Sequence, residues 1–329
     1  MESSLSRRQQ EKKVIMSIYI KFHKIIKRIK KFFYRISHFG IYVTFFDYFY
    51  EITKYPAISK VKHKAVAKWL QGKYQKFIFR HYEKANSLPQ GNIPKQIWLC
   101  WWDGIDMMPP IVKACYNSVL HHSNDFQVTV VTKHNYTDYI FIPDHVINKV
   151  KNKRMTLTHF SNIIRMALLY KYGGFWLDAT FLVTDKIKLD VIPFFTIRRG
   201  SNWKHIVNGR WTGHCIAGVP GFYFFNFIYE FLCEYWKEYN YLITYHLYDY
   251  SINLAYDSFP EIKAAFDNVK PSNINNTLIN YFNNEYDSGV YEEVIKDTIF
   301  HKLTWKHNFS TTNFNNKITL YGYILDKYQ

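Results

Sequence analysis

Residues 158–181, THFSNIIRMALLYKYGGFWLDATF, place a strongly apolar helical segment directly before two glycines and a short aromatic strand. At about 100° per residue, one narrow sector of this helix is polar, and apolar residues cover most of the remaining surface. The members of the polar sector are Thr158, Ser161, Asn162 and Arg165. An unpaired charge inside a protein is too costly, so Arg165 requires an anionic partner. That partner is either a carboxylate of the sheet, in a structural ion pair, or a phosphorylated or hydroxylated ligand.

The strand that follows ends on an acid. Gly173 and Gly174 end the helix, because glycine readily adopts the left-handed conformation of a helix C-cap. Phe175, Trp176 and Leu177 then form a buried strand, and Asp178 stands where it finishes. In open α/β sheets ligands bind beyond the carboxyl ends of strands, where a carboxylate can hold a divalent cation against a pyrophosphate. Asp178 alone is equally a loop or capping aspartate, but the polar stripe, double glycine and terminal acid together favour a functional site.

The surrounding sequence predicts an α/β fold with a mostly parallel sheet, because strands and helices alternate at short spacing. The expected elements are strands at 95–102, 126–132 and 175–183 and helices at 109–122, 143–152 and 158–172. Beyond residue 220 the pattern is mainly helical, with candidates at 222–239, 244–258, 261–269 and 277–286 and a final strand at 301–306. Neither a Gly-x-Gly-x-x-Gly sequence nor a Walker loop is present, which excludes the phosphate loops of Rossmann and P-loop proteins.

The formal charge of +17 is concentrated at one end, because residues 1–40 hold 11 Lys and Arg against 2 Asp and Glu, a net +9. Residues 12–36 match an amphipathic helix with one apolar and one cationic face. Such a helix either lies in the headgroup region of an anionic membrane or packs on the protein with a solvated basic face. Nine net charges exceed what solubility requires, which favours the membrane. A nucleic-acid-binding protein is disfavoured by this distribution and by the absence of a recognisable module.

The four cysteines show no CxxC pair and no zinc-ligand spacing, so the sequence predicts neither structural zinc nor disulfides and favours a reducing compartment. No signal peptide is evident, and no run reaches the roughly 18 uninterrupted apolar residues of a spanning helix. We therefore expect a cytoplasmic protein that is peripheral on the inner face of the cell membrane.

The motif HFSNIIRMALLYKYGGFWLDATFLVT resembles the signature of the capsular polysaccharide synthesis glycosyltransferases, relatives of the family 32 sugar transferases with a DXD motif. The similarity continues upstream in IPKQIWLCWWDGIDMMPPIVKACYNSV and downstream in YFFNFIYEFLCEYWKEYNYLITYHLYDYSINLAY and FHKLTWK. It covers roughly residues 91–306. The resemblance implies a GT-A-like α/β domain at 91–329 with a helix-rich C-terminal part. The basic helical region at 1–90 lies outside the resemblance, and its amphipathic pattern is what favours membrane association.

The implied activity is transfer of a sugar from a nucleotide sugar, with a UDP-sugar as the expected donor, to a surface polysaccharide or lipid-linked glycan. Retention of the anomeric configuration is also implied. The alternative is a catalytically weakened relative that binds sugars or acts as a scaffold. The resemblance assigns catalysis to Asp178, Asp249 and Arg165. It assigns donor binding to Trp98, Trp102, Gly104, Ser161, Asn162, Arg165, Gly174, Asp178, Thr180, His301, Lys302 and Trp305.

Several of these roles have alternatives. Asp178 would bind Mn²⁺ or Mg²⁺, but Thr180 stands where the wider family has its second acid, which weakens the metal assignment. Asn162 replaces a usual aspartate, so the donor preference is altered or the enzyme is weakened. Trp98 is either a stacking partner for the nucleotide base or a core residue. Asp249 is either a second carboxylate near the reacting sugar or a solvated helical residue.

Overall fold

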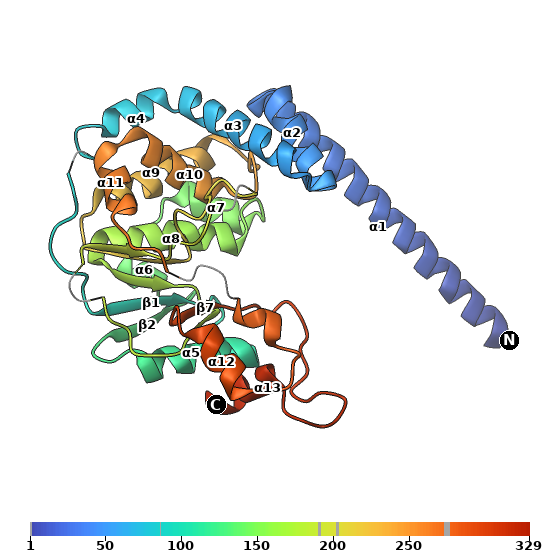
Figure 1. Cartoon of the computed structure of the whole chain (residues 1–329). Helices are drawn as coiled ribbons and strands as arrows, with labels where there is room; N and C mark the ends of the chain where they lie inside the picture. Colours follow the sequence, from blue (N-terminus) through green and yellow to red (C-terminus); the bar gives the residue numbers. More distant parts are fainter. Residues whose placement is uncertain (1, 86, 190–191, 202–203, 273–276) are drawn as a thin grey trace. The chain divides into compact units, whose positions relative to one another are not determined.

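The computed structural model describes residues 2–85, 87–189, 192–201, 204–272 and 277–329, and it divides into two compact units (Figure 1). Unit 1 comprises the chain up to Gly72 together with Tyr241–Tyr245, and unit 2 comprises Lys73–Asn240 and His246–Gln329. Near the N terminus, the side chains of residues 2–11, 13, 14, 20, 21 and 24 lie outside the description. Within the amphipathic helix expected at 12–36, apolar Val14 and cationic Lys21 and Lys24 are expected on its two faces, and their side chains lie outside the described residues.

Unit 1 is helical. Its elements are α1 (Glu2–Phe39), α2 (Ile41–Thr53) and α3 (Pro56–Lys73). The predicted helix at 12–36 is thus part of a longer one. Gly40, with φ of 81°, separates α1 from α2, because glycine accepts this backbone conformation without steric strain. Phe39 is buried and packs edge-on against Trp69, with a ring separation of 5.3 Å. Within the described residues, no helix has the length and apolar character needed to cross a bilayer.

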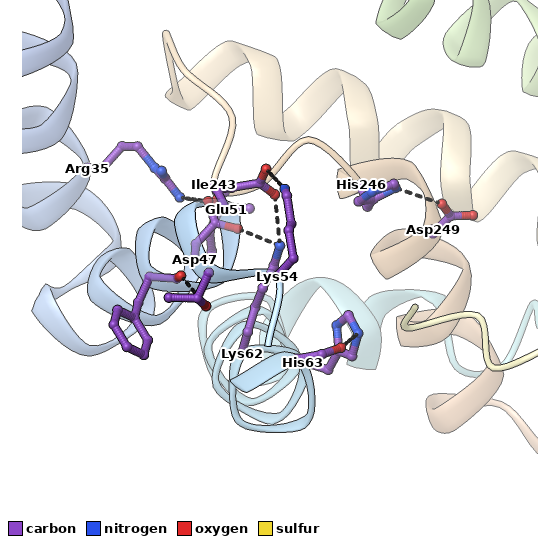
Figure 2. A network of polar contacts seen from close by, with 12 residues as sticks. Arg35, Asp47, Glu51, Lys54, Lys62, His63, Ile243, His246 and Asp249 are labelled. Carbon is purple, nitrogen blue, oxygen red and sulfur yellow. Dashed lines mark hydrogen bonds and ion pairs between the residues drawn. The ribbon is translucent and has the colours of Figure 1, made fainter. Parts of the chain in front are cut away.

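A buried charge network joins the three helices of unit 1 (Figure 2). Asp47 pairs with Arg35 at 2.6 Å and with Lys62 at 2.9 Å, and the three side chains are 7%, 5% and 2% exposed. Burial alone would raise the pKa of Asp47, but Arg35 and Lys62 outweigh burial and hold this pKa below its ordinary value. Arg35 also donates to the carbonyl of Ile243, which ties the Tyr241–Tyr245 segment to α1.

Unit 2 is built around a five-stranded sheet with the strand order β2-β1-β3-β6-β5. The strands are β1 (Gln96–Cys100), β2 (Gln127–Val131), β3 (Gly174–Leu177), β5 (Phe194–Thr196) and β6 (Cys215–Gly218). Strand β1 is parallel to β2 and β3, whereas β6 is antiparallel to both of its neighbours, β3 and β5. Strands β1, β2, β3 and β5 therefore run in one direction and β6 runs against them. The sheet is mixed with mostly parallel strands, which confirms that part of the predicted fold class. A second, antiparallel pair consists of β4 (Phe181–Val183) and β7 (Phe300–Lys302).

Helices cover both faces of the central sheet (Figure 1). The helices of unit 2 are α4 (Gln75–His81), α5 (Pro110–His122), α6 (Tyr136–Tyr139), α7 (Asp144–Lys151), α8 (Leu157–Tyr172), α9 (Tyr223–Glu238), α10 (Leu247–Ser258), α11 (Pro260–Asp267), α12 (Ser288–Ile295) and α13 (Leu320–Lys327), with 3-10 turns at Ile105–Met107 and Leu278–Tyr281. Helices α8 and α9 pack against each other on one face, and α5, which packs against α13, lies on the other. Alternate residues of β3 therefore face different layers: Phe175 and Leu177 enter the core cluster that includes Val119 of α5.

Three sequence-based assignments differ from the structure. The strand expected at 175–183 is two strands in separate sheets, because the chain turns after Leu177 and the amide of Phe181 donates to the carbonyl of Asp178 at 3.0 Å. The helix expected at 277–286 is only the short 3-10 turn Leu278–Tyr281. Strands β5 and β6 were not predicted, since runs of three or four apolar residues carry too little periodicity to distinguish strand from loop.

The two compact units are not the regions on either side of residue 90, and the domain division expected there stays a prediction. The chain passes into unit 2 after Gly72, so α4 belongs with the α/β part. The physical reason is aromatic packing: Phe77 of α4 is buried, with its ring 5.2 Å from that of Phe227 in α9. Tyr74, just before α4, likewise packs against Phe231 at 4.7 Å. These contacts hold α4 to the α/β unit, although its sequence is separated from the first strand by a loop.

Candidate functional site

Asp178 lies at the carboxyl end of β3, as the sequence predicts, and the local backbone fixes it there. Gly174 has φ of 95°, and a Cβ atom at this position would come within 2.5 Å of the carbonyl oxygen of Gln96. Glycine is thus required where β3 enters the sheet beside β1. At the other end of β3, Leu177 pairs with Cys215 of antiparallel β6, and the amide of Asp178 donates to the carbonyl of His214 at 3.0 Å. The start of β6 therefore lies beside the end of β3.

Arg165 reaches Asp178 from α8. Its Nη2 donates to Asp178 Oδ1 at 2.8 Å, and its Nη1 donates to the carbonyl of Gly213. The guanidinium lies over the rings of Trp176 and Tyr248, at 4.9 and 5.0 Å from their centroids. The Arg165 side chain is only 4% exposed, whereas that of Asp178 is 30% exposed. The anionic partner of the buried arginine is therefore the sheet carboxylate, and this ion pair has one side open to solvent.

A second cation approaches Asp178 from the far end of the sequence. Strand β7 pairs with β4 so that Lys302 lies opposite Phe181, directly after the Asp178–Thr180 turn. Lys302 Nζ lies 3.1 Å from Asp178 Oδ2 and also donates to the hydroxyl of Thr180. The Lys302 side chain is 30% exposed. Asp178, Thr180 and Lys302, three residues that the resemblance assigned to the donor site, are thus brought into direct contact.

The electrostatics of this cluster favour negatively charged ligands. Burial alone would raise the pKa of Asp178, but Lys302 and Arg165 outweigh it and hold the pKa well below its ordinary value, so the acid is ionised. Burial, reinforced by Lys302, lowers the pKa of the adjacent His214 to about 4, so this imidazole is neutral at pH 7. Two cations therefore face one carboxylate, so Arg165, Lys302 and Asp178 together carry a net charge of +1, before the nearby Asp249 is counted. Positive charge in a partly desolvated setting suits phosphate oxygens.

Asp249 belongs to the same electrostatic environment, because its charge acts on both Arg165 and His214. It lies in the first turn of α10, is 24% exposed, and has its Oδ2 3.5 Å from His246 Nδ1 (Figure 2). Burial raises the pKa of the neighbouring Tyr248 to about 12 against the opposing effect of Arg165, and Asp249 contributes to the increase. Asp249 is thus a second carboxylate near the ion pair, partnered by a histidine.

Other residues assigned to the donor site lie in different surroundings. Trp98 is 3% exposed and its indole donates to the carbonyl of Gly173 at 3.0 Å, which is the core alternative. His301 is 2% exposed, with Nε2 3.4 Å from the hydroxyl of Thr184. It precedes Lys302 in β7, so the two side chains point to opposite faces of that strand. Gly174 serves close strand packing, and Ser161 donates to its own helix at the carbonyl of Thr158.

Aromatic residues of the segment after β1 pair with distant rings. Trp305 is 47% exposed, and its ring centre lies 5.8 Å from that of Trp101. Trp102 packs against Tyr136 and Phe160, both at 5.5 Å. Gly104, with φ of 93°, precedes the 3-10 turn Ile105–Met107. Trp305 and the segment after β1 are therefore in contact, and the donor-binding role of Trp305 stays a prediction.

Asn162 lies one helical turn before Arg165 and is buried, at 7% exposure. This places it on the polar side of α8, as its spacing from Arg165 predicts. The consequence of asparagine at this position for donor choice or activity stays a prediction.

Three residues of the cluster were not assigned to the site from sequence. Trp176 donates its indole N–H to Asp178 Oδ1 at 3.0 Å, and Tyr248 donates to the carbonyl of Gly213 at 3.0 Å. His214 adjoins Asp178 through the backbone pairing of β6 with β3. Trp176 and Tyr248 were detectable in principle, because each lies within two residues of an assigned acid. His214 was not, because its strand carries no recognisable pattern.

The side chains around Asp178 are not those of a divalent-cation site. Magnesium and similar hard cations take about six oxygen ligands. Asp178 Oδ2 and Thr180 Oγ1 both contact the ammonium of Lys302, which lies where a cation would use these two oxygens. Among the described residues, no group of three or more His, Cys, Asp or Glu side chains could hold a metal ion. The arrangement seen does not fit the cation, and the use of Mn²⁺ or Mg²⁺ by the working protein stays a prediction.

The carboxylate and its two cations lie at the carboxyl end of a central strand, the place where open α/β sheets bind their ligands. The family model described as "Capsular polysaccharide synthesis protein" matches residues 46–324. This match covers most of the chain, and the protein therefore belongs to that family. The match begins within α2, so it extends further toward the N terminus than the motifs recognised in the sequence alone.

The chain is also similar to two curated fungal proteins. It is 29% identical over 94 residues to the O-glycosyltransferase braB of Annulohypoxylon truncatum, a match that covers 26% of this chain and 22% of that protein. It is 29% identical over 107 residues to the O-glycosyltransferase PaGT of Phomopsis amygdali, covering 29% and 25% of the two chains. The matched segment thus spans about a quarter of the length of either relative.

Among solved structures, the PaToxG glycosyltransferase matches with a TM-score of 0.42 and 12% sequence identity. The match covers 65% of this chain and 82% of that one.

Proposed function

We propose that this protein is a glycosyltransferase of GT-A type that transfers a sugar, with retention of configuration, from a nucleotide-sugar donor such as a UDP-sugar. The acceptor would be a growing surface polysaccharide or a lipid-linked glycan. The observation that carries the proposal is the convergence of Arg165 and Lys302 on Asp178 beyond the end of β3. Membership of the capsular polysaccharide synthesis family and the similarity to two O-glycosyltransferases support it.

The proposed chemistry follows from the charges at this position. A nucleoside diphosphate leaving group gains negative charge as its bond to the sugar breaks, and cations fixed in advance lower the energy of that transition state. Lys302 is part exposed and can contact phosphate oxygens, while Arg165 is buried and holds Asp178 in place. Asp249 supplies a second carboxylate that can hydrogen-bond sugar hydroxyls. The residues thus divide into a cation for the leaving group and acids for orientation.

The first test is donor turnover. Purified full-length protein incubated with UDP-, GDP-, ADP- and CMP-sugars should release free nucleotide from one donor class, in transfer to water or to an added oligosaccharide. Asp178→Asn, which preserves the shape of the side chain, should reduce this release by about 100-fold. Asp125→Asn is the matched control, because Asp125 pairs with Lys95 on the surface, at 61% exposure, and is assigned no role in the site.

Donor binding without turnover by the wild-type protein would favour the sugar-binding or scaffold alternative. Absence of both binding and turnover across the panel would contradict the enzyme proposal. If the control substitution reduced nucleotide release as much as Asp178→Asn, the result would contradict a role of Asp178 in the site.

We also propose that unit 1 docks on the inner face of an anionic membrane. Up to Gly72 the chain holds 16 Lys and Arg against 4 Asp and Glu, so this part carries +12 of the total formal charge of +17. On α1, six exposed apolar side chains follow steps of three and four residues and fall within a sector of about 80°, while exposed Met16 and Tyr19 lie outside it. The six residues are Ile15, Ile18, Phe22, Ile25, Ile29 and Phe33, each at least half exposed. An apolar stripe beside cationic side chains suits a lipid headgroup region.

Helix α2 adds a second apolar face to unit 1. Its exposed members are Ile41, Tyr42, Phe45, Phe49 and Ile52, whereas Val43 and Asp47 are buried on its other side. A nucleic acid offers charge but no apolar medium for such side chains, so their exposure favours a membrane as the partner.

Liposome sedimentation tests this surface. Deleting residues 1–40 would also remove Arg35, a partner of buried Asp47, so substitutions are the cleaner design. Phe22→Gln together with Ile29→Gln should reduce binding to phosphatidylserine vesicles by about tenfold or more, since two buried apolar side chains are worth about 1.5–3 kcal/mol each. Phe314→Gln, an exposed apolar residue of unit 2, is the matched control. Unchanged binding of the double variant, or stronger binding to RNA than to vesicles, would contradict the docking proposal.

A further inference from the structure

Both oxygens of the Asp178 carboxylate are engaged by hydrogen-bond donors. Oδ1 accepts from Arg165 at 2.8 Å and from the indole of Trp176 at 3.0 Å. Oδ2 accepts from Lys302 at 3.1 Å. Two cations, Arg165 and Lys302, thus contact the acid that the family resemblance gives as a metal ligand.

The ammonium of Lys302 contacts Asp178 and Thr180 at once. These are the first and third positions of the Asp-Ala-Thr sequence, where a two-acid motif would present both carboxylates to a cation. The register of β7 with β4 fixes this position, because Lys302 lies opposite Phe181 and the amide of Leu303 donates to the carbonyl of Thr180 at 2.8 Å. Lys302 is therefore held by a strand pairing rather than by its side-chain contacts alone.

A divalent cation at the same place would meet an unfavourable environment. It would have one carboxylate and one neutral hydroxyl as protein ligands, with the positive charges of Arg165 and Lys302 nearby. Replacing the second acid by Thr180 removes negative charge, and Lys302 adds positive charge at the point where the cation would bind. The loss of the second acid and the presence of Lys302 fit together if the lysine supplies the positive charge that a metal would otherwise supply.

We propose that Lys302, positioned by Asp178 and Thr180, takes the place of the divalent cation, so that this protein transfers its sugar without a metal. This inference rests on the proposed glycosyltransferase function and specifies how its leaving group is stabilised. In the transfer, the bond between the sugar C1 and the β-phosphate oxygen breaks, and its electron pair stays on that oxygen. The acceptor hydroxyl oxygen forms the new bond to C1, and its proton passes to the departing phosphate. The Lys302 ammonium neutralises the charge that develops on the diphosphate.

The test uses wild-type protein and the donor identified by the nucleotide-sugar panel. The rate of turnover in about 5 mM EDTA should differ less than twofold from the rate in about 5 mM Mn²⁺, because no bound cation is needed to neutralise the leaving group. Lys302→Met should lower kcat about 100-fold in both conditions, the typical effect of removing one such donor. Lys306→Met, an exposed lysine further along the same segment, should leave kcat unchanged.

A second variant makes the test independent of activity. Thr180→Asp together with Lys302→Ala provides two acids and removes the competing cation, and should bind Mn²⁺ in calorimetry at least tenfold more tightly than wild type. Wild-type turnover that disappears in EDTA and returns with Mn²⁺ would overturn the inference while leaving the proposed function intact. No turnover with any donor in either condition would instead count against the proposed function, and equal Mn²⁺ affinity of wild type and double variant would count against the role of Lys302.

Discussion

Asp178→Ala should lower the free energy of unfolding by about 3–5 kcal/mol, the typical effect of removing one partner of a buried ion pair. The reason is that Arg165, at 4% exposure, would keep its charge without the carboxylate that neutralises it. Asp103→Ala is the control, because its pair with Lys133 is exposed and should contribute less than about 1 kcal/mol. Denaturant unfolding of the two variants beside wild type measures both effects.

This expectation affects how activity data are interpreted. An inactive alanine variant could be inactive because Arg165 is displaced, whereas Asp178→Asn retains an oxygen acceptor and the shape of the side chain. Equal stability of Asp178→Ala and wild type would mean that the ion pair does not form in solution. In that case the buried guanidinium would need another anionic partner.

Asp47→Ala should destabilise unit 1 by about 3–5 kcal/mol or more, because it leaves two buried cations, Arg35 and Lys62, without their shared acid. Amide hydrogen exchange of α2 and α3 measures this loss directly, since it reports local opening as well as global unfolding. Because the pKa of Asp47 is held below its ordinary value, the stabilisation is present at neutral pH and is lost as the pH falls below about 4.

Glu51→Ala provides the matched control in the same helix. Glu51 contacts Lys54 and Lys62 but is 50% exposed, so its loss should cost less than about 1 kcal/mol. Similar exchange rates for the two variants would contradict the buried network. If unit 1 docks on membranes as proposed, Asp47→Ala should also weaken vesicle binding, although it changes no exposed apolar residue.

The local part of the site was predictable from the sequence. Arg165 and Asp178 are joined by one helix, a double glycine and a four-residue strand, so their meeting follows from 3.6-residue periodicity and the direction of a parallel strand. The mostly parallel character of the sheet followed from the same alternation of elements. The split of the segment at 175–183 into β3 and β4 did not, because Asp178 and Thr180 turn the chain within a continuous apolar pattern.

The long-range part was not predictable in the same way. The contact of Lys302 with Thr180 depends on the register of β7 with β4, across more than a hundred residues of chain, and a shift of one position would turn Lys302 to the other face. For Trp98, residue type alone allowed either base stacking or a core position. Its burial depends on neighbouring elements that the sequence does not place, and it is 3% exposed. The buried partners of Arg35 likewise lie in another helix and in the 241–245 segment.

The return of Tyr241–Tyr245 to unit 1 has a consequence for how the protein is made. Arg35 donates to the carbonyl of Ile243, so the first helices emerge from the ribosome some 200 residues before one of their acceptors exists. During that interval the exposed apolar stripes of α1 and α2 are already complete. If unit 1 docks on a membrane as proposed, it can do so before the sheet of unit 2 has formed, so that attachment would precede folding of the candidate active site. Expression of an isolated N-terminal fragment would reproduce this intermediate and not the finished unit.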